Sequence, residues 1–247
     1  MGVSDLNRNV EVSQIAQKQA GFFRIRFPVP AGDLPASLVP ALRQIAERWG
    51  NSEFRCTGRH ELEIPFVREC DVQQVLSSLQ QLGFRPTGES QRPNVVACPG
   101  TDHCPVAMAK TKDLCLEVEA FLLKAEKGGT LPPEFKVAIS GCPNECTQVL
   151  VNDVGFIGAI GSYGGQKLQG FELAAGGSLQ GDGRLAARIA FVSPEDVIST
   201  LRDVLEIYRQ RAVKGTPFHE FFFETGPEEF STLLLEQLKR RMWFFQI

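Results

Sequence analysis

Hydrophobic and polar residues alternate along the first third of the chain in a way that predicts a small α/β layer. Residues 21–30 (GFFRIRFPVP) alternate Phe and Ile with Arg, which predicts a strand ended by proline. Residues 34–50 have helical spacing of their apolar side chains, and residues 54–66 predict further strand structure. Residues 71–84 predict a second amphipathic helix. This order of elements favours helices packed on one face of a sheet.

A second group of elements is expected after a linker at residues 85–90. Pro105 is typical of a first helical turn, so the pattern predicts a helix from Pro105 through Ala125. The first twenty residues are polar and predict a loosely attached arm. The other expected elements are strands at 135–140 and 151–161, a strand and loop at 170–184, and helices at 193–213 and 226–242.

Composition and charge exclude some classes of function. Hydrophobic residues at 43% and charged residues at 22% are ordinary for a globular protein. A net charge of −3 provides no general attraction to nucleic acid or to an anionic membrane, so neither partner is expected. The N-terminus lacks the apolar region of a signal peptide, and no apolar run is long enough for a membrane span. We therefore expect a cytoplasmic protein.

Four of the seven cysteines form two closely spaced pairs. Cys98 and Cys104 have the spacing C-x5-C, and Cys142 and Cys146 have the spacing C-x3-C. Proline, glycine, threonine and asparagine surround both pairs and keep the chain out of regular structure. Four thiolates from two loops are ligands that zinc or an iron–sulfur cluster accepts. Because structural zinc sites more often use shorter spacings, C-x5-C favours the cluster, and zinc stays open as the alternative.

The segments around these cysteines resemble a known family. Residues 92–111 (RPNVVACPGTDHCPVAMAKT) and 135–159 (FKVAISGCPNECTQVLVNDVGFIGA) are similar to the cluster-and-siroheme region of the sulfite and nitrite reductases. Upstream, residues 23–34 and 54–64 resemble the ferredoxin-like half-domain that precedes this region. The resemblance implies an α+β fold, with the arm and ferredoxin-like half-domain at 1–90. An α/β siroheme- and [4Fe–4S]-binding domain is then expected at 91–247.

The same resemblance implies two cofactors and a set of site residues. A [4Fe–4S] cluster would be bound by Cys98, Cys104, Cys142 and Cys146, with Cys146 also bridging to the siroheme iron. Arg24 and Arg92 would bind the substrate anion, and Lys136 would supply a proton or a charge. The residues expected to contact siroheme are Arg55, Thr57, Arg59, His60, Thr101, Asn144, Gly176 and Gly177.

The function implied by the resemblance is six-electron reduction of sulfite to sulfide. Reduction of nitrite to ammonia is the close alternative, and a non-catalytic iron–sulfur electron-transfer module or a zinc-stapled binding domain are alternatives of other classes. Two positions depart from the family pattern, since Glu134 replaces a usual lysine and His60 a usual glutamine. Familiar members contain two copies of this unit and this chain has one, so we expect a homodimer. A separate donor protein such as ferredoxin would supply electrons.

Overall fold

The computed structural model describes residues 10–86, 94–129, 131–163 and 166–244. The chain divides into two compact units, Met1–Gln91 and Arg92–Ile247, here called unit 1 and unit 2. The linker expected at residues 85–90 was wrong for Arg85 and Pro86, which belong to a strand (β5, Phe84–Pro86), and residues 87–90 lie outside the described ranges. None of the helices in the described ranges combines the length and apolar character needed to cross a membrane.

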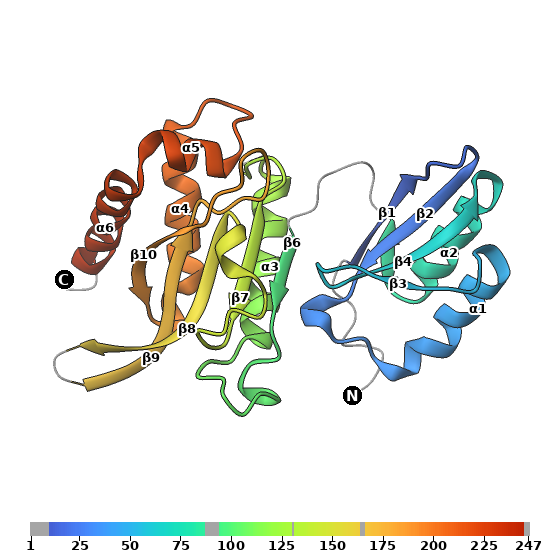
Figure 1. Ribbon diagram of the computed structural model, residues 1–247, viewed down its shortest axis with the longest axis horizontal. Coiled ribbons are helices and arrows are strands. Elements are labelled where there is room, and N and C mark those ends of the chain that lie inside the picture. The colour runs from blue at the N-terminus through green and yellow to red at the C-terminus, as the bar shows by residue number, and fades with distance from the viewer. Residues whose placement is uncertain (1–9, 87–93, 130, 164–165, 245–247) are drawn as a thin grey trace. The chain divides into compact units, whose positions relative to one another are not determined.

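Unit 1 is a sheet covered on one face by two helices. Its described strands follow the order β3-β4-β2-β1-β5. Helices α1 and α2 lie against the same face of this sheet (Figure 1). The elements are β1 (Val10–Ala16), β2 (Phe22–Pro28), α1 (Val39–Trp49), β3 (Arg55–Cys56), β4 (Glu61–Arg68), α2 (Val72–Gln81) and β5 (Phe84–Pro86).

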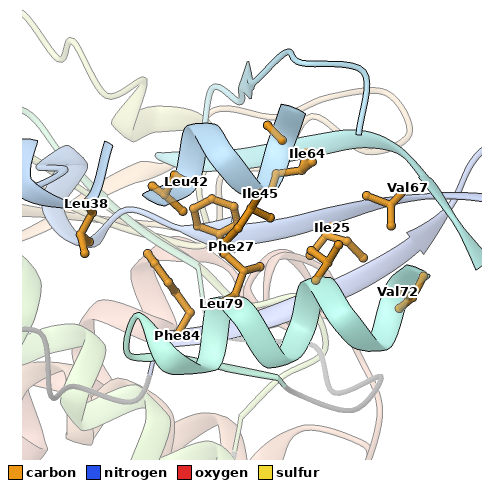
Figure 2. Packing of buried hydrophobic residues seen from close by; sticks show 12 residues of the cluster. Ile25, Phe27, Leu38, Leu42, Ile45, Ile64, Val67, Val72, Leu79 and Phe84 are labelled. Carbon is orange, nitrogen blue, oxygen red and sulfur yellow. The ribbon is translucent and has the colours of Figure 1, made fainter. Parts of the chain in front are cut away.

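The core of unit 1 follows directly from the alternating pattern of its strands. Ile25 and Phe27 on β2 and Ile64 on β4 have no exposed surface, and all three face the helices (Figure 2). The helices contribute Leu42, Ile45, Val72, Val75 and Leu79 to the same cluster. Because successive side chains of a strand point to opposite faces, the arginines of β2 are left on the face without helices.

The expectation of a loose N-terminal arm was wrong for residues 10–16. These residues form β1, which pairs antiparallel with β2 and parallel with β5. Strand β2 is its neighbour in the chain, whereas β5 is distant, as in the pair Val10 and Phe84, and pairing on both sides stabilises this segment. Residues 1–9 lie outside the described ranges.

Unit 2 contains a mixed sheet with the described order β10-β9-β8-β7-β6. Strands β6, β7 and β8 are parallel to one another, and β9 and β10 are antiparallel to their neighbours. Figure 1 shows β8 and β9 continuing as a long hairpin beyond the other strands. The elements are β6 (Asn94–Ala97), α3 (Lys112–Lys127), β7 (Lys136–Ser140), β8 (Val154–Tyr163), β9 (Gln166–Ala175), β10 (Ala187–Val192), α4 (Val197–Arg211), α5 (Phe218–Thr225) and α6 (Pro227–Phe244).

The two units together are the α+β organisation predicted from the sequence. The parallel strands of unit 2 are buried and nearly continuous in apolar residues, as β7 illustrates: Val137, Ala138 and Ile139 have no exposed surface. Ligands of sheets of this kind bind beyond the carboxyl ends of the parallel strands. The first residues beyond β6 and β7 are therefore the natural place to look for a site.

Candidate metal centre and its polar surroundings

Both cysteine loops begin at the carboxyl ends of adjacent parallel strands. Ala97, the last residue of β6, pairs with Ile139 of β7, and Cys98 continues the ladder by donating its N–H to the Ile139 carbonyl at 3.0 Å. Gly141 follows β7, and its N–H points at the Cys98 sulfur, with 3.0 Å between Gly141 N and Cys98 Sγ. A backbone N–H donated to a cysteine sulfur is typical of iron–sulfur sites, where it helps set the reduction potential.

The segment between Cys104 and α3 joins the two loops rather than forming a helix. Met108 and Ala109 donate their N–H groups to the Gly141 carbonyl at 2.7 and 3.2 Å. The Ala109 carbonyl in turn accepts the Thr101 N–H at 3.2 Å. The expected helix is confirmed from Lys112, where α3 begins, but its expected start at Pro105 was wrong. The backbone groups that would have formed its first turns are used to tie the cysteine loops together.

The loops are packed so tightly that glycine is required beside them. A Cβ added to Gly158 of β8 would lie 2.3 Å from the Gly141 carbonyl oxygen. A Cβ added to Gly100, which has a φ of +60°, would lie 2.4 Å from Thr111 Oγ1. That hydroxyl donates to the Cys98 carbonyl at 2.6 Å. The chain thus encloses Cys98 and Gly141 in a backbone cradle that a larger side chain would disrupt.

The four cysteines of the loops differ in exposure. Cys142 is 7% exposed, Cys98 and Cys104 are half-buried, and Cys146 is exposed. All four are free thiols. Cys146 is thus the sulfur of the set that has most access to a second group outside the loops.

The donor set fits a cluster better than a single ion. Four sulfurs bound to one zinc ion at about 2.3 Å would lie about 3.8 Å from one another. Within the part of the chain that the structure describes, no three His, Cys, Asp or Glu side chains are grouped to hold one metal ion. A [4Fe–4S] cluster holds its four cysteine sulfurs further apart, because the iron atoms lie between them. Four thiols on two joined loops, with a backbone N–H aimed at the sulfur of Cys98, suit such a cluster.

Unit 1 gathers three arginines around one buried glutamate. Glu63 of β4 has a side chain only 2% exposed, and its Oε1 accepts from Arg26 Nε and Nη2 at 2.8 and 2.6 Å. Arg24 Nε lies 3.6 Å from the same oxygen, and Arg55 Nε lies 3.9 Å from Oε2. The register of the sheet explains the cluster, since Arg26 and Arg55 are both the direct cross-strand partners of Glu63.

This arginine cluster borders a cleft of about 620 Å³. Arg24, Arg55 and Glu63 line it together with Gln17, Glu53, Phe54, Cys56, Pro65 and Phe66. Arg24 Nε is buried and makes no hydrogen bond within the described residues. The cleft lining carries two guanidinium groups, Arg24 and Arg55, against two carboxylates, Glu53 and Glu63, so it presents arginine forks that suit an anion without an excess of positive charge.

Arg24 and Arg55 were expected from the sequence as site residues, whereas Glu63 was not. The available signal was the pattern itself. Two alternating arginines on one strand and two alternating glutamates, Glu61 and Glu63, on another predict a charged face, but only the pairing register shows that they meet.

The turn between β3 and β4 holds the next group of expected site residues. The Thr57 hydroxyl accepts the N–H groups of Arg59 and Glu61 at 3.2 and 3.3 Å, which orders the turn. His60 has a φ of +54°, and its buried Nδ1 makes no hydrogen bond within the described residues. Burial lowers the pKa of His60, and the charge of Arg59 lowers it further against the opposite effect of Asp33. The neutral form of the imidazole is therefore favoured at pH 7.

The remaining expected contacts lie in several different places. Thr101 and Asn144 are exposed residues of the first and second cysteine loops. Gly176 and Gly177 follow β9, which places them level with the amino end of β7 and away from the cysteines. An added Cβ would lie 2.1 Å from Phe222 Cδ1 at Gly176 and 2.3 Å from the Leu150 carbonyl oxygen at Gly177, so close packing within the chain requires both glycines. Their contact with siroheme stays a prediction. Arg92 lies outside the described residues.

Lys136 is the first residue of β7, at the end of the strand opposite to the cysteine loops. Its backbone N–H donates to Asp153 Oδ2 at 2.8 Å, and its Nζ lies 3.9 Å from Glu134 Oε2. The other oxygen of Asp153 lies 3.6 Å from His219 Nδ1 of α5. Burial raises the pKa of the Asp153 carboxyl to about 6, although Lys136 and His219 both act to lower it. The sequence analysis missed this pair, and a carboxylate inside the apolar run VNDVGF was the available signal.

The raised pKa of Asp153 predicts a specific dependence of stability on pH. Between about pH 4 and pH 6 the carboxyl ionises in the unfolded chain but stays protonated in the folded one, so stability falls as pH rises through this window. Asp153→Asn keeps an oxygen acceptor for the Lys136 N–H but removes the titration. Denaturant unfolding from pH 4 to 7 should show the variant gaining about 3 kcal/mol relative to the parent protein. If the free energy of unfolding changed with pH in the same way in Asp153→Asn and in the parent protein, the raised pKa of Asp153 would be contradicted.

Both units match models of known protein families. Residues 15–82 match the model described as nitrite/sulfite reductase ferredoxin-like half domain. Residues 88–242 match the model described as nitrite and sulphite reductase 4Fe-4S domain.

Individual proteins agree with this placement. The chain is 29% identical over 199 residues to the chloroplastic ferredoxin–nitrite reductase of Oryza sativa, covering 80% of this chain and 33% of that protein. It is 30% identical over 159 residues to one of the anaerobic sulfite reductase subunits of Salmonella typhimurium, covering 57% of this chain and 44% of that one. The chain thus spans about a third to under half of these relatives. The structure of the Mycobacterium tuberculosis NirA protein superimposes with a TM-score of 0.73 at 22% identity, covering 90% of this chain and 41% of that one, and so shares the fold.

Proposed function

Since the chain belongs to the nitrite and sulphite reductase family, with its ferredoxin-like half domain and its 4Fe-4S domain, we propose that it reduces sulfite to sulfide. The observation that carries the proposal is the pair of cysteine loops joined through Gly141 at the carboxyl ends of β6 and β7. The family carries a [4Fe–4S] cluster and siroheme, and these two cofactors are the ones proposed to act here.

The protein's own groups would hold these cofactors in different ways. Cys98, Cys104 and Cys142 would bind the cluster, and exposed Cys146 would bind it on the side open to siroheme. When bound, the two cofactors supply electrons to the substrate one at a time. The backbone N–H of Gly141 would stabilise the charge on the Cys98 thiolate. The tightly packed loops would exclude water from the buried sulfur of Cys142.

The basic residues would bind anions. In unit 1, Arg24 and Arg55 line the cleft beside Glu63, so a carboxylate of siroheme or the substrate anion would find paired guanidinium groups there. Arg59 and Thr57 on the adjoining turn would bind further carboxylates of siroheme. Lys136 would hold a proton or a positive charge near the substrate, and Arg92 would add a further positive group.

Turnover with a reduced viologen dye would distinguish the substrates. Under anaerobic conditions, the proposal expects a higher kcat/KM with sulfite than with nitrite. A preference for nitrite would replace sulfite reduction by reduction of nitrite to ammonia, in line with the relatives named as ferredoxin–nitrite reductases. A protein that keeps the cluster but lacks siroheme and turns over neither anion would be a non-catalytic electron-transfer module. A ferredoxin is the proposed physiological donor.

We also propose that two copies of the chain share each site. Lys136 and the cysteine loops lie at opposite ends of β7, and the five residues of this strand place the Cα atoms of Lys136 and Ser140 about 13 Å apart. Both ends belong to unit 2, so this separation does not depend on how the two units are placed. A lysine side chain is too short to reach the cysteine loops of its own chain, whereas a second copy could present its Lys136 and Arg24 there.

Mixing two inactive variants would test this arrangement. Cys146→Ser and Lys136→Ala chains should each be inactive alone, yet a refolded or co-expressed equal mixture should recover about a quarter of the parent activity. Half of the dimers would be mixed, and each mixed dimer would contain one intact site. If the mixture is no more active than the separate variants, or if the fully loaded protein is an active monomer by light scattering, sites are not shared.

A further inference from the structure

The loop between Cys142 and β8 is held in an uncommon backbone conformation. Glu145 and Gln148 have φ values of +49° and +53°, in the left-handed region that residues with a Cβ seldom adopt. Such outliers persist where the surroundings determine them strongly, and they gather at functional sites. Here they lie on either side of Cys146, so the conformation decides where the sulfur of this cysteine is placed.

Hydrogen bonds within the loop fix its two ends but leave its middle dependent on another segment. Glu145 N–H donates to the Cys142 carbonyl at 3.3 Å, and Gln148 N–H donates to the Glu145 carbonyl at 2.8 Å. The hydroxyls of Ser140 and Thr147 are 2.8 Å apart and close the loop onto β7. The side chain of Glu145, which is 17% exposed, extends instead toward β10.

Arg188 of β10 binds the side chain of Glu145. Its Nη2 donates to Glu145 Oε1 at 3.0 Å, and its Nη1 donates to Glu172 Oε2 on β9. The register between β9 and β10 shifts between Arg188 and Ala190, an irregularity of the kind that redirects a side chain. A planar guanidinium can bind two carboxylates at once, which the single ammonium of lysine does less well.

We propose that Arg188 is a positioning residue that holds Glu145 in its left-handed conformation and so sets the place of the Cys146 sulfur. Without Arg188, the carboxylates of Glu145 and Glu172 would face each other beside the thiolates, and their repulsion would open the loop. This inference rests on the proposed function for the ligand role of Cys146. The contacts of Arg188 with the loop themselves do not depend on it.

The test compares Arg188→Gln and Arg188→Lys with Arg209→Gln, a matched control that removes an exposed arginine paired with Glu206 on α4. Amide exchange of residues 144–148 is measured in each purified protein, together with the reduction potential and EPR signal of the cluster. Arg188→Gln should speed exchange roughly tenfold or more, as loss of a charge-assisted hydrogen bond implies. It should also change the EPR signal and make the potential more negative, because a positive charge is removed. The exchange rate and potential of Arg188→Lys should lie between those of Arg188→Gln and the parent protein. Those of Arg209→Gln should equal the values of the parent protein.

Two results would overturn the inference. One is loop exchange in Arg188→Gln within twofold of the parent protein. The other is faster exchange accompanied by the potential and EPR signal of the Arg209→Gln control, which would leave Arg188 with a purely structural role. A parent protein that binds no cluster would refute the proposed function instead, and amide exchange alone would then decide whether Arg188 holds the loop.

Discussion

Cys146→Ser is expected to lower sulfite turnover by more than about 100-fold, beyond the 10–100-fold that loss of a group supporting a metal ligand produces. Cys146 is the exposed member of the four loop cysteines and is therefore the one proposed to connect cluster and siroheme. A serine hydroxyl stays protonated at neutral pH and is a poor ligand for iron in a soft-sulfur site. Turnover with a viologen dye and the EPR signal of the siroheme iron measure the loss.

Cys70→Ser is the matched control for this variant. Cys70 is an exposed free thiol of unit 1 and lies outside both cysteine loops. The Cys70→Ser variant should keep the sulfite turnover and the EPR spectrum of the parent protein. Sulfite turnover retained by Cys146→Ser at the level of Cys70→Ser would contradict the role assigned to Cys146.

Glu63→Gln is expected to destabilise unit 1 by about 2–4 kcal/mol. Removing one member of a buried ion pair costs about 3–5 kcal/mol, and the partly exposed arginines around Glu63 reduce that figure. Glutamine retains a hydrogen-bond acceptor for Arg26 but removes the buried charge that the three guanidinium groups share, although Arg26 still lies 3.6 Å from Glu61 Oε2. Calorimetry of the purified protein should show the unfolding transition of unit 1 moving to lower temperature.

Glu47→Gln provides the comparison, because Glu47 pairs with Arg43 on the exposed surface of α1. Water screens an exposed pair of this kind, so its loss should leave the transition nearly in place. Equal effects of the two substitutions would show that the carboxylate of Glu63 does not hold the arginine cluster together.

The sequence predicted the features whose cause is local. The cysteine loops stand in Pro- and Gly-rich segments directly after short apolar runs, and these runs are β6 and β7. The inward-facing Ile25 and Phe27 were likewise predictable from alternation along one strand. The family resemblance around the cysteines agrees with the matched family models, and so does the α+β fold.

The missed features depend on contacts between distant segments. Strand β1 pairs with distant β5 as well as with neighbouring β2, and α3 starts late because Met108 and Ala109 donate to Gly141. Arg188 reaches Glu145 only because β10 adds to the sheet beside β9. No window of adjacent residues contains this information, since both partners of each contact must first be placed by the fold.

The visible spectrum and metal content of anaerobically purified protein test the central claim most directly. The proposal expects the Soret and visible bands of a siroheme together with about five irons per chain, four from the cluster and one from the siroheme. A colourless protein that contains zinc instead of iron would contradict the claim and leave the four cysteines as a structural zinc site.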